Sequence, residues 1–243
     1  LIFMLYIFFM EITKYYSPNY AKKVRSGKSI TMIIIHYTGM QSERESLKRL
    51  TSNKSKVSAH YLIERNGRIL NLVECEHVAW HAGKSMWKKN KNLNKNSIGI
   101  ELANKGHKFG YQKFTKIQIK NLIFLCRKLK KKYKIKNQLI LGHSDIAPLR
   151  KIDPGEKFPW YHLSINGIGN YPKKIKSKNK YKKAQNNDQF FKNLHKIGYR
   201  YLNTKYKNKI IKNFQRKYRQ KKINGIIDLE TLKLSQILSK SSN

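Results

Sequence analysis

Two short apolar runs that each end in a histidine constrain the fold of this chain most strongly. Ile30–His36 reads ITMIIIH and Gln138–His143 reads QLILGH. Continuous runs of this kind predict strands that are buried on both faces of a sheet, and such sheets are covered by helices. Parallel strands bring their carboxyl ends to one edge of a sheet, where sites form. The imidazoles of His36 and His143 can therefore meet there although they are far apart in the sequence.

Further strands and one long helix are predicted around these runs. Val57–Glu64 alternates apolar and polar residues, and an Asn-Gly turn leads it into Ile69–Val73, which predicts a β-hairpin. Ser97–Leu102 leaves Glu101 on a face of otherwise small side chains. Thr115 and the glutamine three residues later form a capping-box pattern ahead of apolar residues at helical spacing. The expected fold class is α/β (α+β), with a mixed central sheet flanked by helices.

The composition changes after residue 172. Residues 173–187 are rich in lysine and poor in apolar residues, which predicts an extended, self-repelling linker between a domain over 25–172 and a second one over 188–243. Within 188–243, apolar residues at helical spacing predict three short helices, the third of which is capped by Asp228. This segment is expected to form a small three-helix bundle.

The net charge bears on the partner of the protein. The chain has 53 Lys and Arg against 13 Asp and Glu, which gives a formal net charge of +40. This charge excludes a small acidic regulator, and it favours a polyanionic partner such as a phosphate polymer or a carboxylate-rich glycopeptide. A compositionally biased genome would impose the same excess of lysine, so both explanations stay open.

The N-terminal segment 1–24 bears on the compartment. Leu1–Met10 is strongly apolar but about half as long as a membrane span, which predicts a truncated export signal or anchor, or a start assigned too early. If this segment is an export signal, the protein is expected in the cell envelope, as a periplasmic or secreted protein. If it is not, the protein is expected in the cytoplasm. Cys75 and Cys126 are too few for a disulfide framework, and neither is expected to be a ligand or a nucleophile.

His36, His143 and Asp153 are the residues best suited to hold a metal ion. Asp153 lies on the proline-bounded loop Ser144–Trp160, which can fold back toward both histidines. Two imidazoles and one carboxylate leave the fourth position of a tetrahedral Zn²⁺ open, as catalysis requires. The chain has no compact motif such as H-E-x-x-H, so the alternative is that both histidines are satisfied core or surface residues.

Six motifs occur in a fixed order between residues 25 and 165. They are IIIHYT (33–38), VSAHYLIERNG (57–67), AWHAGKSMW (79–87), NSIGIELAN (96–104), LGHSDIAP (141–148) and RKIDPGEKFPW (150–160). Any one of them is unspecific, but the ordered set closely resembles the zinc-dependent N-acetylmuramoyl-L-alanine amidases of the AmiD and AmpD type. The resemblance implies one Zn²⁺ per chain, with His36, His143 and Asp153 as its ligands, Glu101 as the catalytic acidic residue and Lys151 as the catalytic cation.

The same resemblance implies a substrate groove that contains Trp80, His81 and Asn104. An aromatic plane suits the face of a sugar, and an amide or imidazole can bond peptide groups. Without the resemblance, any of the three is as well explained as a packing or turn residue.

The C-terminal segment has a likeness of its own. Residues 213–232 (NFQRKYRQKKINGIIDLETL) resemble the three-helix peptidoglycan-binding domain that is attached to cell-wall hydrolases. On a flexible linker, such a domain would raise the concentration of the enzyme on an insoluble polymer. The many lysines leave a nucleic-acid-binding bundle as an alternative, and this alternative places the aromatic and basic residues 199–201 and 217–219 on an exposed face.

The resemblance implies that the protein hydrolyses the amide between N-acetylmuramic acid, or its anhydro form, and the first L-alanine of the peptidoglycan stem peptide. Peptidoglycan and muropeptides are the expected partners, and no specific nucleic acid is expected. The alternative from another class is a peptidoglycan recognition protein that binds muropeptides without cleaving them, because this fold does so when the zinc ligands are lost.

Overall fold

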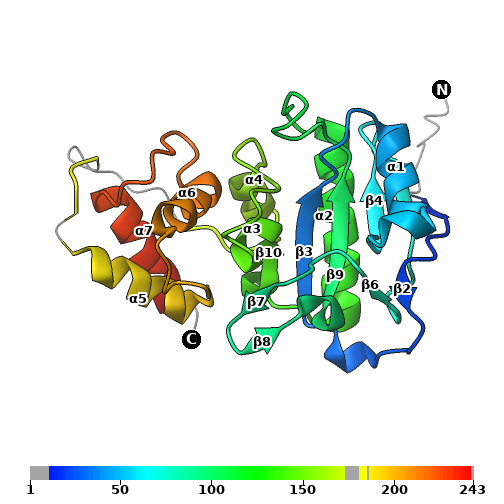
Figure 1. The fold of residues 1–243 in the computed structure, drawn as a ribbon, viewed down its shortest axis with the longest axis horizontal. Coiled ribbons are helices and arrows are strands. Elements are labelled where there is room, and N and C mark those ends of the chain that lie inside the picture. The colour runs from blue at the N-terminus through cyan, green and yellow to red at the C-terminus, as the bar shows by residue number, and fades with distance from the viewer. Residues whose placement is uncertain (1–10, 173–180, 185, 242–243) are drawn as a thin grey trace, which may run out of the picture.

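The computed structural model describes residues 11–172, 181–184 and 186–241, and its larger part is a mixed sheet with helices on its faces (Figure 1). The sheet has the strand order β1-β5-β4-β9-β3-β10. Its strands are β1 (Ile12–Lys14), β3 (Met32–Tyr37), β4 (Tyr61–Ile63), β5 (Ile69–Asn71), β9 (Ser97–Leu102) and β10 (Ile140–Gly142). β4 and β5 pair antiparallel, whereas all other neighbours in this sheet are parallel. The predicted fold class and the predicted hairpin are confirmed.

The carboxyl ends of β3, β9 and β10 meet at one edge of the sheet. β3 pairs in parallel with both of the other strands, and His36 lies opposite Glu101 in the register. β10 ends one residue earlier than predicted, because His143 is the first residue of the short helix α3 (His143–Ile146). His143 therefore begins a helix rather than closing a strand, but it stays at the same edge of the sheet.

Helix α2 (Lys116–Tyr133) packs on one face of the sheet, where Ile119 and Leu122 share a core with Ile33 and Ile35. Its start is confirmed, since the Thr115 hydroxyl accepts a hydrogen bond from the Gln118 amide at 3.1 Å. The second hydrogen bond of the predicted capping box, from the Thr115 amide to the Gln118 side chain, is wrong. The side chain of Gln118 donates instead to two buried backbone carbonyls, Ile63 at 3.0 Å and Ala103 at 3.1 Å.

Shorter elements complete this part of the molecule. They are the helices α1 (Glu43–Thr51) and α4 (Trp160–Ile165) and the paired strands β2 (Tyr20–Ala21) with β6 (Val78–Ala79) and β7 (Met86–Trp87) with β8 (Asn90–Lys91). β1 joins residues 12–14 to the sheet. The predicted signal or anchor at Leu1–Met10 lies outside the described residues. Within the described ranges, no helix has the length and apolarity that a membrane span requires.

The C-terminal helices α5 (Asn187–Ile197), α6 (Lys207–Tyr218) and α7 (Leu229–Lys240) lie beside the β10 edge of the sheet (Figure 1). The three predicted helices are confirmed, and the Asp228 carboxylate caps α7 by accepting from the Thr231 amide at 2.9 Å. Their core is continuous with that of the sheet, because Phe190 and Phe214 belong to the same buried cluster as Ile34. The bundle is thus docked on the sheet. Most of the predicted linker, residues 173–180 and 185, lies outside the described residues.

The nucleic-acid-binding alternative predicts that residues 199–201 and 217–219 form an exposed face. This prediction is wrong for four of these residues. Tyr199, Lys217, Tyr218 and Arg219 are all buried. Lys217 pairs with a buried aspartate of the sheet domain and Arg219 with Asp228, so both charges are neutralised inside the protein.

Candidate active site

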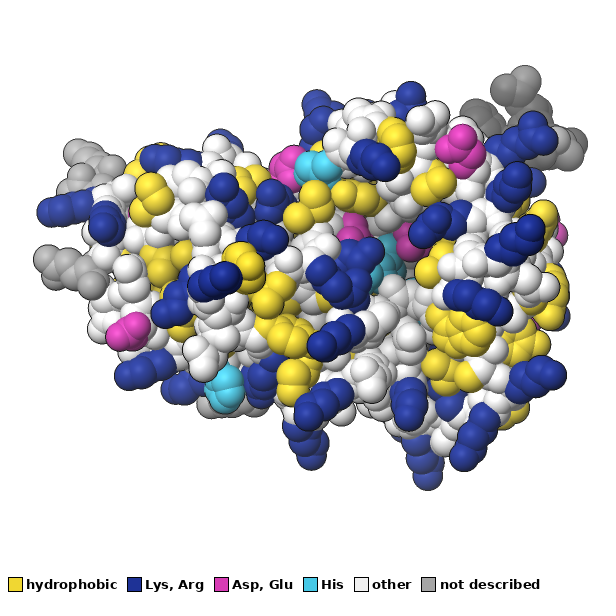
Figure 2. Space-filling view, viewed as in Figure 1, with side chains coloured by type: hydrophobic (Ala, Val, Ile, Leu, Met, Phe, Trp, Pro, Cys, Tyr) yellow, Lys and Arg dark blue, Asp and Glu magenta, His cyan; other side chains and the backbone are white. Residues whose placement is uncertain are grey.

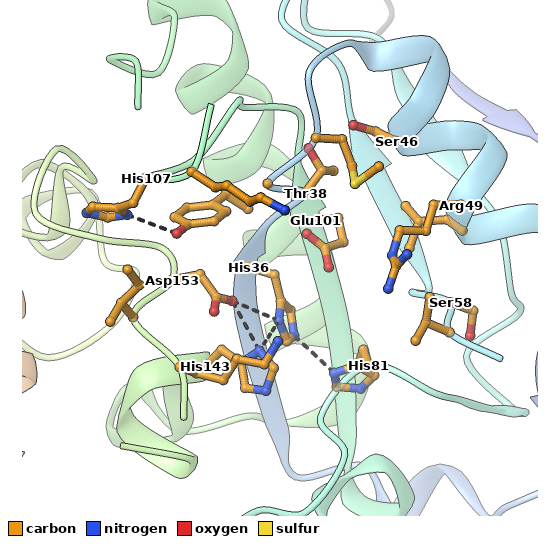
Figure 3. Close-up of a pocket in the computed structure, with 18 of the residues that line it drawn as sticks. His36, Thr38, Ser46, Arg49, Ser58, His81, Glu101, His107, His143 and Asp153 are labelled. Carbon is orange, nitrogen blue, oxygen red and sulfur yellow. Dashed lines mark hydrogen bonds and ion pairs between the residues drawn. The ribbon is translucent and has the colours of Figure 1, made fainter. Parts of the chain in front are cut away.

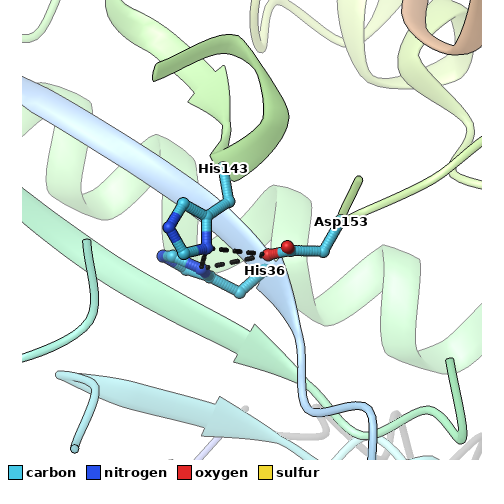
Figure 4. Close-up of side chains that lie close together, drawn as sticks. All are labelled: His36, His143 and Asp153. Atoms are coloured by element: carbon cyan, nitrogen blue, oxygen red, sulfur yellow. Dashed lines mark hydrogen bonds and ion pairs between the residues drawn. The ribbon is translucent and has the colours of Figure 1, made fainter. Parts of the chain in front are cut away.

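His36, His143 and Asp153 converge at the carboxyl edge of the sheet (Figure 4). The Nδ1 atoms of the two histidines are 2.9 Å apart, and Oδ2 of Asp153 lies 3.2 Å from Nδ1 of His36 and 3.1 Å from Nδ1 of His143. All three residues are at most 7% exposed. The loop after α3 folds back to bring Asp153 to this point, as the proline-bounded segment predicted.

The hydrogen bonds around the two rings bear on which nitrogen of each ring carries a proton. Ser97 donates its hydroxyl proton to the carbonyl of Leu93, so its oxygen accepts from Nε2 of His81 at 3.3 Å. Nδ1 of His81 is then bare and accepts from Nε2 of His36 at 3.1 Å. Nε2 of His143 lies 3.2 Å from the carbonyl of Ala82, which can accept its proton, and 3.3 Å from Nη2 of Arg150, which can donate to it. His36 therefore turns an unprotonated Nδ1 toward Asp153, and His143 does the same when its proton lies on Nε2, which is the arrangement that a metal ion requires.

Gly99 on β9 makes this arrangement possible. A Cβ at this position would lie 2.3 Å from the ring of His81, so any larger residue would displace that ring. His81 is buried and packs edge-on against His36. The small side chains that the sequence places around Glu101 on β9 thus leave space for an imidazole that orients His36.

Burial and the neighbouring charges set the protonation of the cluster. Burial, together with the nearby His143, lowers the pKa of His36 to about 4. Although burial by itself raises the pKa of Asp153, the neighbouring imidazoles of His143 and His36 hold it well below its usual range. At neutral pH, His36 is neutral and Asp153 is ionised, which are the forms that bind a divalent cation. The donor set and its geometry therefore fit a metal ion.

Glu101 points into the same space from the end of β9 (Figure 3). Its Oε2 is buried and has no hydrogen-bond partner among the described residues. Burial, and next the charge of Asp153, raise the pKa of Glu101 to about 8, while Lys151 acts in the opposite direction. A carboxyl group with this pKa can both take up and release a proton near neutral pH.

A groove of about 720 Å³ opens above these residues, and its lining includes His36, His143, Asp153, Glu101 and Lys151. Figure 2 shows histidine and acidic side chains on the floor of a hollow that is surrounded by Lys and Arg. The groove thus joins an anionic floor to a cationic rim.

The three predicted substrate residues lie in different surroundings. Trp80 and His81 line the groove, but both ring nitrogens of His81 are engaged by Ser97 and His36. Asn104 does not line it. Its side chain bonds the amide of Gly106 at 3.0 Å and the carbonyl of Gln112 at 2.9 Å, so it holds the loop between them in place. That Asn104 contacts substrate stays a prediction.

Other residues line the groove that the sequence did not single out. Tyr37 and His107 bond to each other at 2.9 Å, and Arg49 reaches the groove from α1. Tyr37 directly follows the predicted ligand His36, so its position in the sequence could have indicated that it lies near the site. Arg49 and His107 carry no such signal, because only the folding of α1 and of the loop after Asn104 brings them to the site.

Comparison with known sequences agrees with the motif order. The model of the family described as Amidase_2, N-acetylmuramoyl-L-alanine amidase, matches residues 26–156. The N-acetylmuramoyl-L-alanine amidase AmiD of Escherichia coli K12 is 41% identical over 155 aligned residues, and the match covers 59% of this chain and 55% of AmiD. The 1,6-anhydro-N-acetylmuramyl-L-alanine amidase AmpD of Haemophilus influenzae is 36% identical over 162 aligned residues, covering 59% of this chain and 85% of AmpD.

Comparison with solved structures extends over more of the chain. The complex of E. coli AmiD with anhydro-N-acetylmuramic acid-L-Ala-D-γ-Glu-L-Lys superposes with a TM-score of 0.78 at 32% identity, covering 91% of this chain and 92% of AmiD. AmpDh3 of Pseudomonas aeruginosa in complex with anhydromuramic pentapeptide superposes with a TM-score of 0.79 at 29% identity, covering 92% of this chain and 96% of that one.

Proposed function

Since the chain belongs to the N-acetylmuramoyl-L-alanine amidase family, we propose that it hydrolyses the amide bond between N-acetylmuramic acid, or its anhydro form, and the L-alanine of the peptidoglycan stem peptide. One observation carries the proposal: two imidazoles that turn Nδ1 toward one another and one carboxylate meet on the floor of an open groove. A volume of about 720 Å³ accommodates a sugar with part of its peptide.

We propose that one Zn²⁺ is held by Nδ1 of His36, Nδ1 of His143 and a carboxylate oxygen of Asp153. This donor set leaves a fourth tetrahedral position free. A zinc ion bound there would supply an acidified water and polarise the scissile carbonyl. Ser97 and His81 keep His36 in the required tautomer, and Ala82 does the same for His143.

Glu101 and Lys151 are proposed as the catalytic residues. Glu101 takes a proton from the attacking water and passes it to the leaving amine, a dual task for which a pKa of about 8 is suited. The Lys151 ammonium stabilises the negative charge that develops on the oxygen of the scissile carbonyl. Trp80 offers its ring to the sugar. Because these groups occur together with the three ligands, we favour hydrolysis over recognition without cleavage.

The first prediction concerns the metal. The full chain is expected to release the free peptide from anhydro-N-acetylmuramic acid-L-Ala-D-γ-Glu-L-Lys, to lose this activity to below detection after treatment with a chelator, and to regain it when Zn²⁺ is added. Release of peptide is followed by chromatography. A rate that survives complete removal of metal would contradict the proposal, and a magnesium control should not restore activity because Mg²⁺ prefers oxygen ligands.

The C-terminal helices are proposed to bind the cell wall, which places the activity in the cell envelope. This proposal rests on the resemblance of residues 213–232 to a peptidoglycan-binding domain. Nucleic-acid binding is disfavoured, because the aromatic residues Tyr199 and Tyr218 are buried and cannot stack on bases.

The second prediction tests wall binding. The full chain is expected to co-sediment with purified peptidoglycan sacculi at about 0.3 M salt, where exposed charges are largely screened. The amount of protein in the pellet is measured over a salt series, with another polyanionic polymer as a control. Complete release between about 0.1 and 0.3 M salt would show that the +40 charge alone holds the protein on the wall.

A further inference from the structure

The loop between α3 and Asp153 is held by side chains of α6, a helix of the C-terminal bundle. The amide nitrogen of Asn213 donates to the carbonyl of Pro148 at 2.8 Å and to the carbonyl of Lys151 at 2.9 Å. Its amide oxygen accepts from Arg216 at 2.9 Å. Two acceptors and one donor determine the orientation of this amide completely, and Asn213 is only 2% exposed.

A second contact joins the same helix to the segment that carries His143. Asp145 is 1% exposed, and its carboxylate accepts from Lys217 at 2.5 Å and from Tyr199 at 2.5 Å. It also accepts from the amide of Gly142 at 2.8 Å, the residue directly before His143. Lys217 is buried against the ring of Trp160. The buried carboxylate of the sheet domain therefore has its counter-charge in the bundle.

Asn213, Lys217 and Gln220 follow one another at intervals of four and three residues, the spacing of one helix face. Gln220, just beyond the end of α6, donates to the carbonyl of Phe158 at 2.7 Å. One line of polar side chains thus contacts the sheet domain on both sides of Asp153. These contacts join the bundle to the segment that carries His143, Lys151 and Asp153.

We propose that α6 is a part of the catalytic apparatus, and that Asn213 is a positioning residue that sets the place of Lys151 and Asp153. The inference rests on the roles given above to these two residues. The carbonyls of Pro148 and Lys151 both accept from the side-chain amide of Asn213, so the segment between them is held at both ends. A displacement of about 1 Å in a catalytic group costs up to about 10²-fold in rate.

Asn213→Asp is the sharpest test, because it keeps the size of the side chain and replaces the two donors with an oxygen that repels both carbonyls. We expect kcat on the soluble muropeptide to fall about 10- to 100-fold while KM changes less than about threefold. We also expect Zn²⁺ affinity, measured by competition with a chelator, to fall about tenfold, because Asp153 lies on the same loop. Asn213→Ala, which removes the donors without adding a charge, should show the same pattern if Asn213→Asp does not fold.

The matched control is Asn193→Ala in α5. Asn193 is also buried and donates to Ser235 at 2.9 Å, but this contact lies inside the bundle. The control should lower the melting temperature and leave kcat and Zn²⁺ affinity within about twofold of wild type. A wild-type kcat for folded Asn213→Asp or Asn213→Ala would overturn the inference, and so would a loss of kcat in Asn193→Ala that parallels its loss of stability. If wild-type protein fails to cleave the muropeptide, the proposed function fails, whereas Zn²⁺ affinity still tests whether Asn213 positions Asp153.

Discussion

Replacing Glu101 with glutamine is expected to lower kcat about 10³-fold, because the amide can neither take the proton of the attacking water nor return it to the leaving amine. KM and bound zinc should stay close to wild type, since Glu101 is not among the proposed ligands. Release of peptide under saturating muropeptide and the zinc content of the purified variant measure the two effects. Equal kcat in both proteins would remove Glu101 from the mechanism.

The same substitution is expected to stabilise the metal-stripped protein above pH 5. Because the pKa of Glu101 is raised to about 8, the folded chain holds a proton that the unfolded chain releases above pH 4 to 5. Stability from this group is thus full at low pH and is lost as the pH rises to about 8. At pH 7 the free energy of unfolding is lowered by about 3 kcal/mol, and Glu101→Gln should largely restore it.

Urea unfolding in the presence of a chelator should show a higher free energy of unfolding for the variant at pH 7 and no difference at pH 4. The exposed Glu11→Gln is the control and should show no gain at either pH.

Replacing Lys151 with methionine is expected to lower kcat about 10²- to 10³-fold, the usual cost of removing one charge that stabilises an oxyanion. The pH dependence should change as well. Lys151 lowers the pKa of Glu101, so its removal raises that pKa further, and the limb of the pH–rate profile that requires ionised Glu101 should move to higher pH. The profile of kcat against pH measures the shift.

Lys120→Met is the matched control for Lys151→Met. Lys120 is exposed on α2, and its replacement makes the same change in net charge. Its kcat and pH profile should be those of wild type. An equal loss of activity in both variants would mean that overall charge, rather than the position of Lys151, supports the reaction.

The local patterns of the sequence predicted the elements of this fold well. The buried runs before His36 and His143 became β3 and β10, and Asp228 caps α7 as expected. These features depend on residues that are close together in the chain, such as apolar spacing and a capping side chain, so the sequence contains the information needed to predict them. The motif order then indicated which distant residues share a site.

The errors have a common cause in contacts between distant segments. Gln118 was expected to complete a cap, but buried carbonyls of two strands take its donors. The nucleic-acid-binding alternative placed Lys217 and Arg219 on an exposed face, yet each pairs with a buried carboxylate. A single sequence shows the charge of a lysine and does not show which aspartate will lie beside it.

The sequence by itself determined the mixed α/β class, the three C-terminal helices and the candidate set of two histidines and one aspartate, because strand and helix periods and motif order are properties of the linear chain. Only the tertiary structure decided that both imidazoles turn Nδ1 toward Asp153 and that α6 bonds the loop of Lys151. These outcomes depend on hydrogen bonds between groups such as Ser97 and His81, or Asn213 and Pro148, which become neighbours only when the sheet and the bundle have packed.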